Sequence, residues 1–116
     1  MGTLLEELKS WGCDVDGAME RFIDDEGLYR TCLDSVMADK NFEGLLDALN
    51  RHDVSAAFEY AHTLKGVLSS MGLTPMYDIV VRIVEPLRAG SDENLLPVCD
   101  ELMQSKKLLG KLIEAG

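Results

Sequence analysis

One histidine, with a lysine and a glycine one helical turn further on, is the part of this sequence that could do chemistry. Residues 61–66 read Ala-His-Thr-Leu-Lys-Gly. A neutral imidazole has a nitrogen lone pair at neutral pH and can accept a phosphoryl group. The Lys65 ammonium can neutralise phosphoryl oxygens, and Gly66 removes a side chain where the incoming group would collide. The pattern therefore indicates phosphoryl transfer onto His62.

A helix over about 53–72 is expected to carry this run, with Asp53 as its N-cap and Gly72 at its end. At about 100° per residue, one apolar stripe faces a core, and it consists of Ala57, Ala61, Leu64, Leu68 and Met71. His62 lies well round from that stripe, so its ring should point to solvent. Its column on the helix contains Ser55, Phe58, Gly66 and Ser69. Ser69 could supply a hydroxyl near the phosphoryl group, and Ser55 could contact a docked partner. Phe58 could either contact that partner or cover the edge of the core.

The remaining segments have helical periods, and none alternates with the period of a strand. Short helices over 4–11 and about 14–23 predict a cap, residues 1–24, on one end of a bundle formed by 25–115. Longer helices are expected at about 25–49 with a possible break at 39–41, at 53–72, at 74–89, and from about 91 onward. The fold prediction is all-α, an antiparallel four-helix bundle.

Several helix details follow from single residues. The apolar stripe of the first long helix would consist of Leu28, Cys32, Val36 and Met37, with Leu33 and Tyr29 beside it. Thr74 would cap the third, with proline in its first turn, and Pro86 would kink or end it near its C-terminus.

Length and composition bound the function. The 116 residues make one domain, and a net charge of −10 argues against nucleic acid or an anionic membrane as a partner. Three widely spaced cysteines predict reduced thiols in a cytoplasmic protein. No apolar run approaches the roughly 20 residues of a membrane span.

The sequence lacks the motifs of a complete enzyme. It has no metalloprotease pair, no phosphate-binding glycine loop, no nucleophile elbow and no kinase catalytic loop. His52 and His62 are ten residues apart across an expected loop, so they do not form an i, i+4 metal pair. We therefore expect no metal site, no cofactor and no kinase activity.

Residues 61–66, followed by Gly72, resemble the motif of the histidine phosphotransfer (HPt) domain family, His-x-Leu-Lys-Gly with a trailing glycine. The similarity extends to 21–29 upstream and to Leu87-Arg88-Ala89-Gly90 downstream, and so covers most of the chain.

This resemblance implies a phosphocarrier in a multistep phosphorelay. His62 would be the phosphorylated residue, Lys65 its electrostatic neighbour and Gly66 the residue that leaves clearance. The partners would be response-regulator receiver domains and a hybrid sensor kinase, with Mg²⁺ carried by the receiver. We expect a monomer.

Two other interpretations stay open at this point. The chain could be the phosphorylated N-terminal domain of a chemotaxis-type kinase, although it ends at Gly116 without a dimerisation or ATP-binding segment. It could also be a helical interaction module that binds receivers without transfer.

Overall fold

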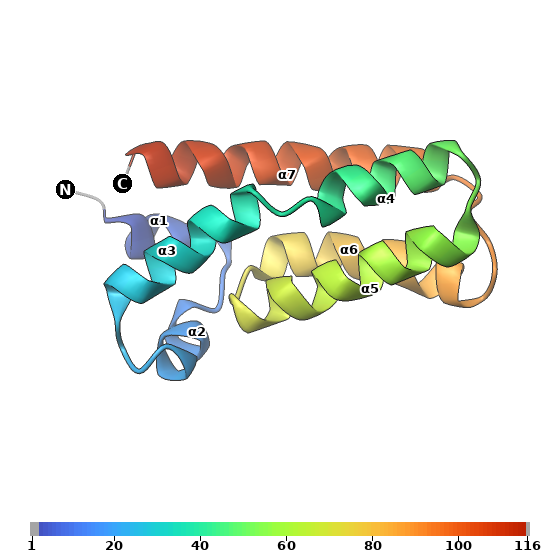
Figure 1. Cartoon of the computed structure of the whole chain (residues 1–116). Coiled ribbons are helices and arrows are strands. Elements are labelled where there is room, and N and C mark those ends of the chain that lie inside the picture. Colours follow the sequence, from blue (N-terminus) through green and yellow to red (C-terminus); the bar gives the residue numbers. More distant parts are fainter. Residues whose placement is uncertain (1–2, 116) are drawn as a thin grey trace.

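The computed structural model describes residues 3–115, and within that range every regular element is a helix (Figure 1). The all-α prediction is confirmed. The described helices are, in order, α1 (Leu4–Trp11), α2 (Val15–Arg21), α3 (Glu26–Met37), α4 (Asn41–Asn50), α5 (Val54–Ser70), α6 (Thr74–Arg88) and α7 (Leu95–Ala115). None of these helices is long and apolar enough to cross a membrane.

Helices α4 to α7 form an antiparallel four-helix bundle, in which short loops reverse the chain between successive helices (Figure 1). Each packs against the next, and α7 returns to contact α4, so the four enclose one core. The three remaining helices lie at the end of the bundle where α5 turns into α6 and where α7 ends (Figure 1). The short N-terminal helices thus cap one end, as predicted.

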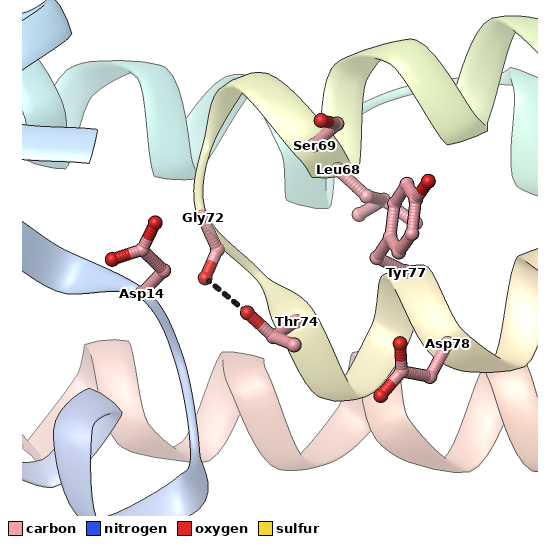
Figure 2. Close-up of a pocket in the computed structure, with 7 residues that line it drawn as sticks. All are labelled: Asp14, Leu68, Ser69, Gly72, Thr74, Tyr77 and Asp78. Atoms are coloured by element: carbon pink, nitrogen blue, oxygen red, sulfur yellow. Dashed lines mark hydrogen bonds between the residues drawn. The ribbon is translucent and has the colours of Figure 1, made fainter. Parts of the chain in front are cut away.

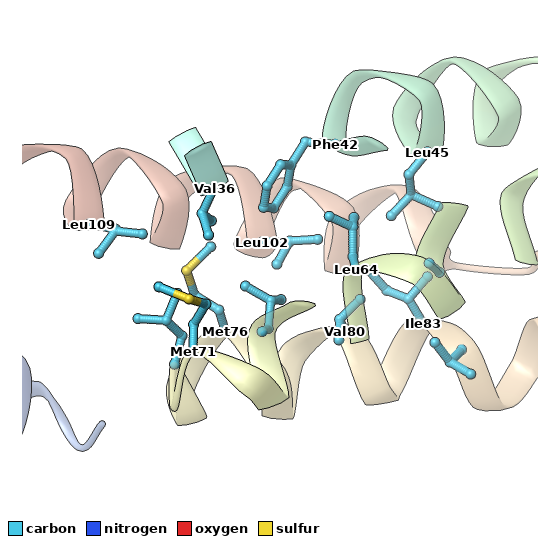
Figure 3. Close-up of a cluster of buried hydrophobic side chains, with 14 of the residues drawn as sticks. Val36, Phe42, Leu45, Leu64, Met71, Met76, Val80, Ile83, Leu102 and Leu109 are labelled. Atoms are coloured by element: carbon cyan, nitrogen blue, oxygen red, sulfur yellow. The ribbon is translucent and has the colours of Figure 1, made fainter. Parts of the chain in front are cut away.

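Each bundle helix contributes one apolar stripe to the core, and α1, α2 and α3 add further buried side chains at one end, such as Val36 (Figure 3). The stripe expected for α5 is buried throughout, from Ala57 to Met71. Phe42 and Leu45 of α4 and Leu102 of α7 meet it from the opposite side, and all three are fully buried. Burying such side chains contributes roughly 1.5–3 kcal/mol each, which fixes the rotation of α5 about its own axis.

The first long helix departs from its prediction. The Asp39–Asn41 stretch does interrupt it: α3 ends at Met37, and the Asp39 carboxylate accepts hydrogen bonds from the backbone and side-chain amides of Asn41, at 2.8 and 2.7 Å. The predicted stripe is only partly right: Val36 is buried, but Leu28 is 48% exposed and Cys32 and Met37 are only partly buried. The buried side chains of α3 are Tyr29, Leu33 and Val36. As a separate helix, α3 is free to turn a different face to α7.

Two other helix starts are also corrected. Thr74 is the first residue of α6 rather than its cap, which is Leu73 and makes no side-chain cap hydrogen bond. α7 begins at Leu95, four residues later than expected, because a loop with Asn94 at a φ of 59° precedes it. Pro97 is therefore in the first turn, as required, and α6 continues for two residues past Pro86.

The two ends of α5 are formed by different contacts. At the N-terminus the Asp53 carboxylate accepts the backbone N–H of Ala56 at 3.0 Å, as expected of an N-cap. After its last residue, Gly72 adopts a left-handed φ of 68°. The Gly72 carbonyl accepts the N–H of Asp14 at 2.8 Å, and a Cβ at Gly72 would collide with the carbonyl oxygen of Asp14. This glycine therefore ends α5 and allows the segment before α2 to pack against the α5–α6 turn.

The N-terminal helices also hold the last carbonyls of α5. Arg21 donates from Nε to the Ser70 carbonyl at 2.9 Å and from its terminal nitrogen to that of Ser69 at 3.1 Å. The buried Tyr29 hydroxyl donates to the Met71 carbonyl at 2.8 Å. Carbonyls at a helix C-terminus have no partner within the helix, so a guanidinium and a hydroxyl satisfy them here. The capping helices thus fix the end of the helix that carries His62.

We predict that Tyr29 makes stability sensitive to alkaline pH. Burial raises its pKa from 10.0 to about 12, so its stabilising effect is fully present below pH 10 and is lost as the pH rises to about 12. Tyr29→Phe should lower the free energy of unfolding by about 1–2 kcal/mol at pH 8, and this deficit should shrink above pH 10. Urea unfolding followed by circular dichroism measures it. Tyr77→Phe is the control, and a deficit that stays constant with pH would contradict the prediction.

We also predict opposite effects of alanine at two glycines of the α5 region. A Cβ at Gly66 would meet no atom within 4 Å, so Gly66→Ala should raise the free energy of unfolding by about 0.5–1 kcal/mol through helix propensity. Gly72→Ala should lower it by at least about 1 kcal/mol, because it adds a Cβ in the left-handed region against a backbone oxygen. Chemical denaturation of both variants tests this, and equal shifts would refute it.

Candidate functional site

His62 lies near the middle of α5 and is exposed, as its position on the helix predicted. Nearby residues on the other face of α5 are buried: Ala61 is fully buried and Leu64 lies in the core. Within residues 3–115 no hydrogen bond is formed by either nitrogen of the His62 ring. The ring therefore stands on a rigid element with a nitrogen lone pair open to an incoming group.

Lys65 and Gly66 lie on the next turn of α5. The Lys65 side chain is partly buried and forms no ion pair with another described residue, so its ammonium is available to an anion. Gly66 is exposed, and the space that a side chain would occupy there is empty. An imidazole, a free cation and an unobstructed approach thus share one short stretch of helix surface.

The structure adds a contact on the other side of His62. The Phe58 ring, one turn earlier, stacks on the imidazole with their centroids 5.6 Å apart and their planes 16° apart. The guanidinium carbon of Arg88, from the end of α6, lies 5.4 Å from the centroid of the same Phe58 ring. Sequence reasoning noted Arg88 only as part of the family resemblance. The antiparallel return of α6 is what brings it beside Phe58.

A shallow hollow of about 210 Å³ adjoins this stack and is lined by Val54, Ser55, Phe58, Leu87 and Arg88. Ser55 and Phe58 were predicted to contact a partner, and the structure places both in this hollow. Its apolar walls with one cation suit a side chain of a docked protein.

Ser69 belongs to a second hollow, of about 240 Å³, where the segment before α2 approaches the α5–α6 turn (Figure 2). Asp14, Thr74, Tyr77 and Asp78 also line it. Ser69 follows His62 by seven residues, which is about 10 Å along a helix axis. The structure therefore gathers Lys65 and Gly66 around the ring, but places Ser69 further along the same face.

The other histidine lies elsewhere. His52 is in the α4–α5 loop with a φ of 57°, and its Nδ1 is 3.0 Å from the Asp92 carboxylate. It is exposed, as predicted, but its pairing with Asp92 could not be seen in the sequence. Among the described residues no group of three or more histidine, cysteine or acidic side chains could hold a metal ion.

Comparison with known proteins is consistent with this geometry. No curated protein and no solved structure matches the chain. A family model described as the Hpt domain matches residues 28–115, which is most of the chain and includes α4 to α7 and His62. Hpt domains act as phosphocarriers in histidine phosphotransfer and interact with receiver domains of two-component systems. The chain belongs to the Hpt domain family.

Proposed function

We propose that this protein accepts a phosphoryl group on His62 from the aspartate of one receiver domain and passes it to the aspartate of another. The observation that carries this proposal is the exposed His62 ring in the middle of α5, without a hydrogen-bond partner among the described residues. A convex helix face can enter the acidic pocket of a partner, so the chain needs no cleft of its own.

The transfer step is a nucleophilic substitution at phosphorus. The lone pair of one His62 ring nitrogen forms the N–P bond, while the bond between phosphorus and the aspartyl oxygen of the receiver breaks. The electron pair of that bond stays with the oxygen and regenerates the receiver carboxylate. The proton on the other ring nitrogen does not need to move. Onward transfer is the reverse of this step with a second receiver.

Lys65 and Gly66 assist by charge and by space. An ammonium one helical turn from the ring stabilises the phosphoryl oxygens as negative charge shifts between donor and acceptor. The empty position at Gly66 lets the backbone of the receiver come close to the imidazole. Ser69, seven residues further along the helix, would contact the docked receiver.

The same proposal includes the source of the metal ion, the upstream kinase, the location and the oligomeric state. The acidic pocket and Mg²⁺ would belong to the receiver, which agrees with the chemistry that His62 and Lys65 supply by themselves. A hybrid sensor kinase would carry the first receiver, and the protein would act in the cytoplasm. It would be a monomer, because most of its apolar side chains pack into one core.

The first prediction of this proposal concerns the labelled residue. A phosphorylated receiver should transfer an acid-labile, base-stable label to the protein, and His62→Gln should abolish that label. His52→Gln is the matched control, since the chain has two histidines, and it should be labelled like the wild type. Label on the His62 variant would refute the assignment. Receiver binding in calorimetry without any label on the wild type would favour a pure interaction module instead.

The second prediction concerns Lys65. Lys65→Gln removes the free ammonium and should slow transfer at saturating receiver about tenfold or more, while Lys65→Arg should retain most of the rate. Rapid-quench measurement of transfer from a phosphorylated receiver provides the rate. Unfolding free energies of both variants should stay within about 0.5 kcal/mol of the wild type, because no ion pair in the described structure is lost. Equal rates for the glutamine and arginine variants would exclude an electrostatic role.

A further inference from the structure

We propose that Phe58 and Arg88 are positioning residues that hold the His62 ring in the orientation required for transfer. This inference rests on the proposed function and assigns a different task to Phe58 from the docking contact expected from the sequence.

No hydrogen bond in the described structure orients the His62 ring. Functional histidines usually have one ring nitrogen hydrogen-bonded to a carboxylate or a carbonyl, which sets the ring plane. In residues 3–115 His62 has no such bond. The second side-chain torsion of histidine is broad, so an exposed ring without partners would sample many orientations. The stack on Phe58, at 5.6 Å and 16°, is therefore the contact that restricts it.

Phe58 is itself held in place by the neighbouring helix. It is partly buried against the core, and the Arg88 guanidinium lies over its ring at 5.4 Å. The Arg88 Nε also lies 3.7 Å from the carboxylate of Glu85, one turn earlier on α6. Arg88 thus couples the end of α6 to the ring plane of His62 through Phe58.

Ring orientation matters because attack on phosphorus must be in line with the bond that breaks. A reacting atom that is already aligned avoids the loss of orientational freedom in the transition state. A positioning role and a docking role then predict different kinetics. Loss of positioning lowers the transfer rate at saturating receiver, whereas loss of docking raises the receiver concentration needed for half the maximal rate.

Transfer kinetics with a phosphorylated receiver test this. Phe58→Leu keeps an apolar side chain but removes the stack, and it should lower the maximal rate roughly three- to tenfold with half-saturation changed less than about twofold. Phe58→Tyr should restore the rate. Arg88→Ala should lower the maximal rate roughly two- to fivefold, and Arg88→Lys should keep most of it, because the cation over the ring is retained.

The control is Phe22→Leu. Phe22 is also partly buried, and its ring packs edge-on against Tyr29 at 5.4 Å, a contact that the variant loses. Phe22 lies at the capped end of the bundle. It should transfer at the wild-type rate once its folding is verified by circular dichroism. A matching loss of rate in this variant would mean that lowered stability explains the Phe58 result, and would overturn the inference.

A measurement on the free protein tests the stack without any receiver. The carbon-bound ring protons of His62 should be displaced in the NMR spectrum by the ring current of Phe58, and Phe58→Leu should abolish that displacement. Arg88→Ala should reduce it. Unchanged His62 ring protons in Phe58→Leu would overturn the inference.

The outcomes separate the two proposals. A wild-type protein that takes no label would overturn the phosphocarrier function and the positioning role with it. A labelled wild type, together with a Phe58→Leu variant that transfers at an undiminished maximal rate, would overturn the positioning role alone. An effect confined to half-saturation would assign Phe58 to docking.

Discussion

Burial of one stripe of α5 is the constraint on which the rest of the structure depends. Ala57, Ala61, Leu64 and Leu68 are fully buried, and each leucine contributes roughly 1.5–3 kcal/mol by leaving water. Turning α5 by one residue's rotation to bury His62 would bring these leucines to the surface. The burial of the core therefore enforces the exposure of the histidine, and no additional interaction at His62 is needed to keep it exposed. It also explains how a helix without a cleft can present a nucleophile in a fixed place.

Two glycines on and after α5 illustrate how the same residue meets different physical demands. Gly66 has helical geometry and borders empty space, so a side chain there would fit within the protein itself. Glycine is unfavourable inside a helix by about 1 kcal/mol, and the fold offers nothing in return. Gly72 has a left-handed φ and a backbone oxygen at the place of its missing Cβ. The second glycine is explained by folding, whereas the first has no role in the fold and, under the proposed function, leaves space for the receiver.

Contacts between distant parts of the chain complete both ends of the functional helix. At its C-terminal end Arg21 and Tyr29 bind the last carbonyls of α5 across 42 to 49 residues of sequence. Near its N-terminal half Arg88 of α6 covers the Phe58 ring that stacks on His62. Both arrangements use cations or hydroxyls brought by packing of other helices. α5 is therefore held from two sides while the histidine face remains open.

The sequence by itself determined the helical fold and the boundaries of α5. It also determined the buried stripe of α5 and the exposure of His62 with Gly66 beside it. These features follow from local periodicity and from helix end signals within some twenty residues. It misjudged the buried face of α3, the cap of α6 and the start of α7, since each depends on how separate helices meet. Only the tertiary structure decided that Arg88 reaches Phe58 and that Ser69 borders a different hollow from Phe58. Such neighbours are set by the antiparallel packing of α5 and α6. The residue pattern of one helix does not predict which side chains of another helix will contact it.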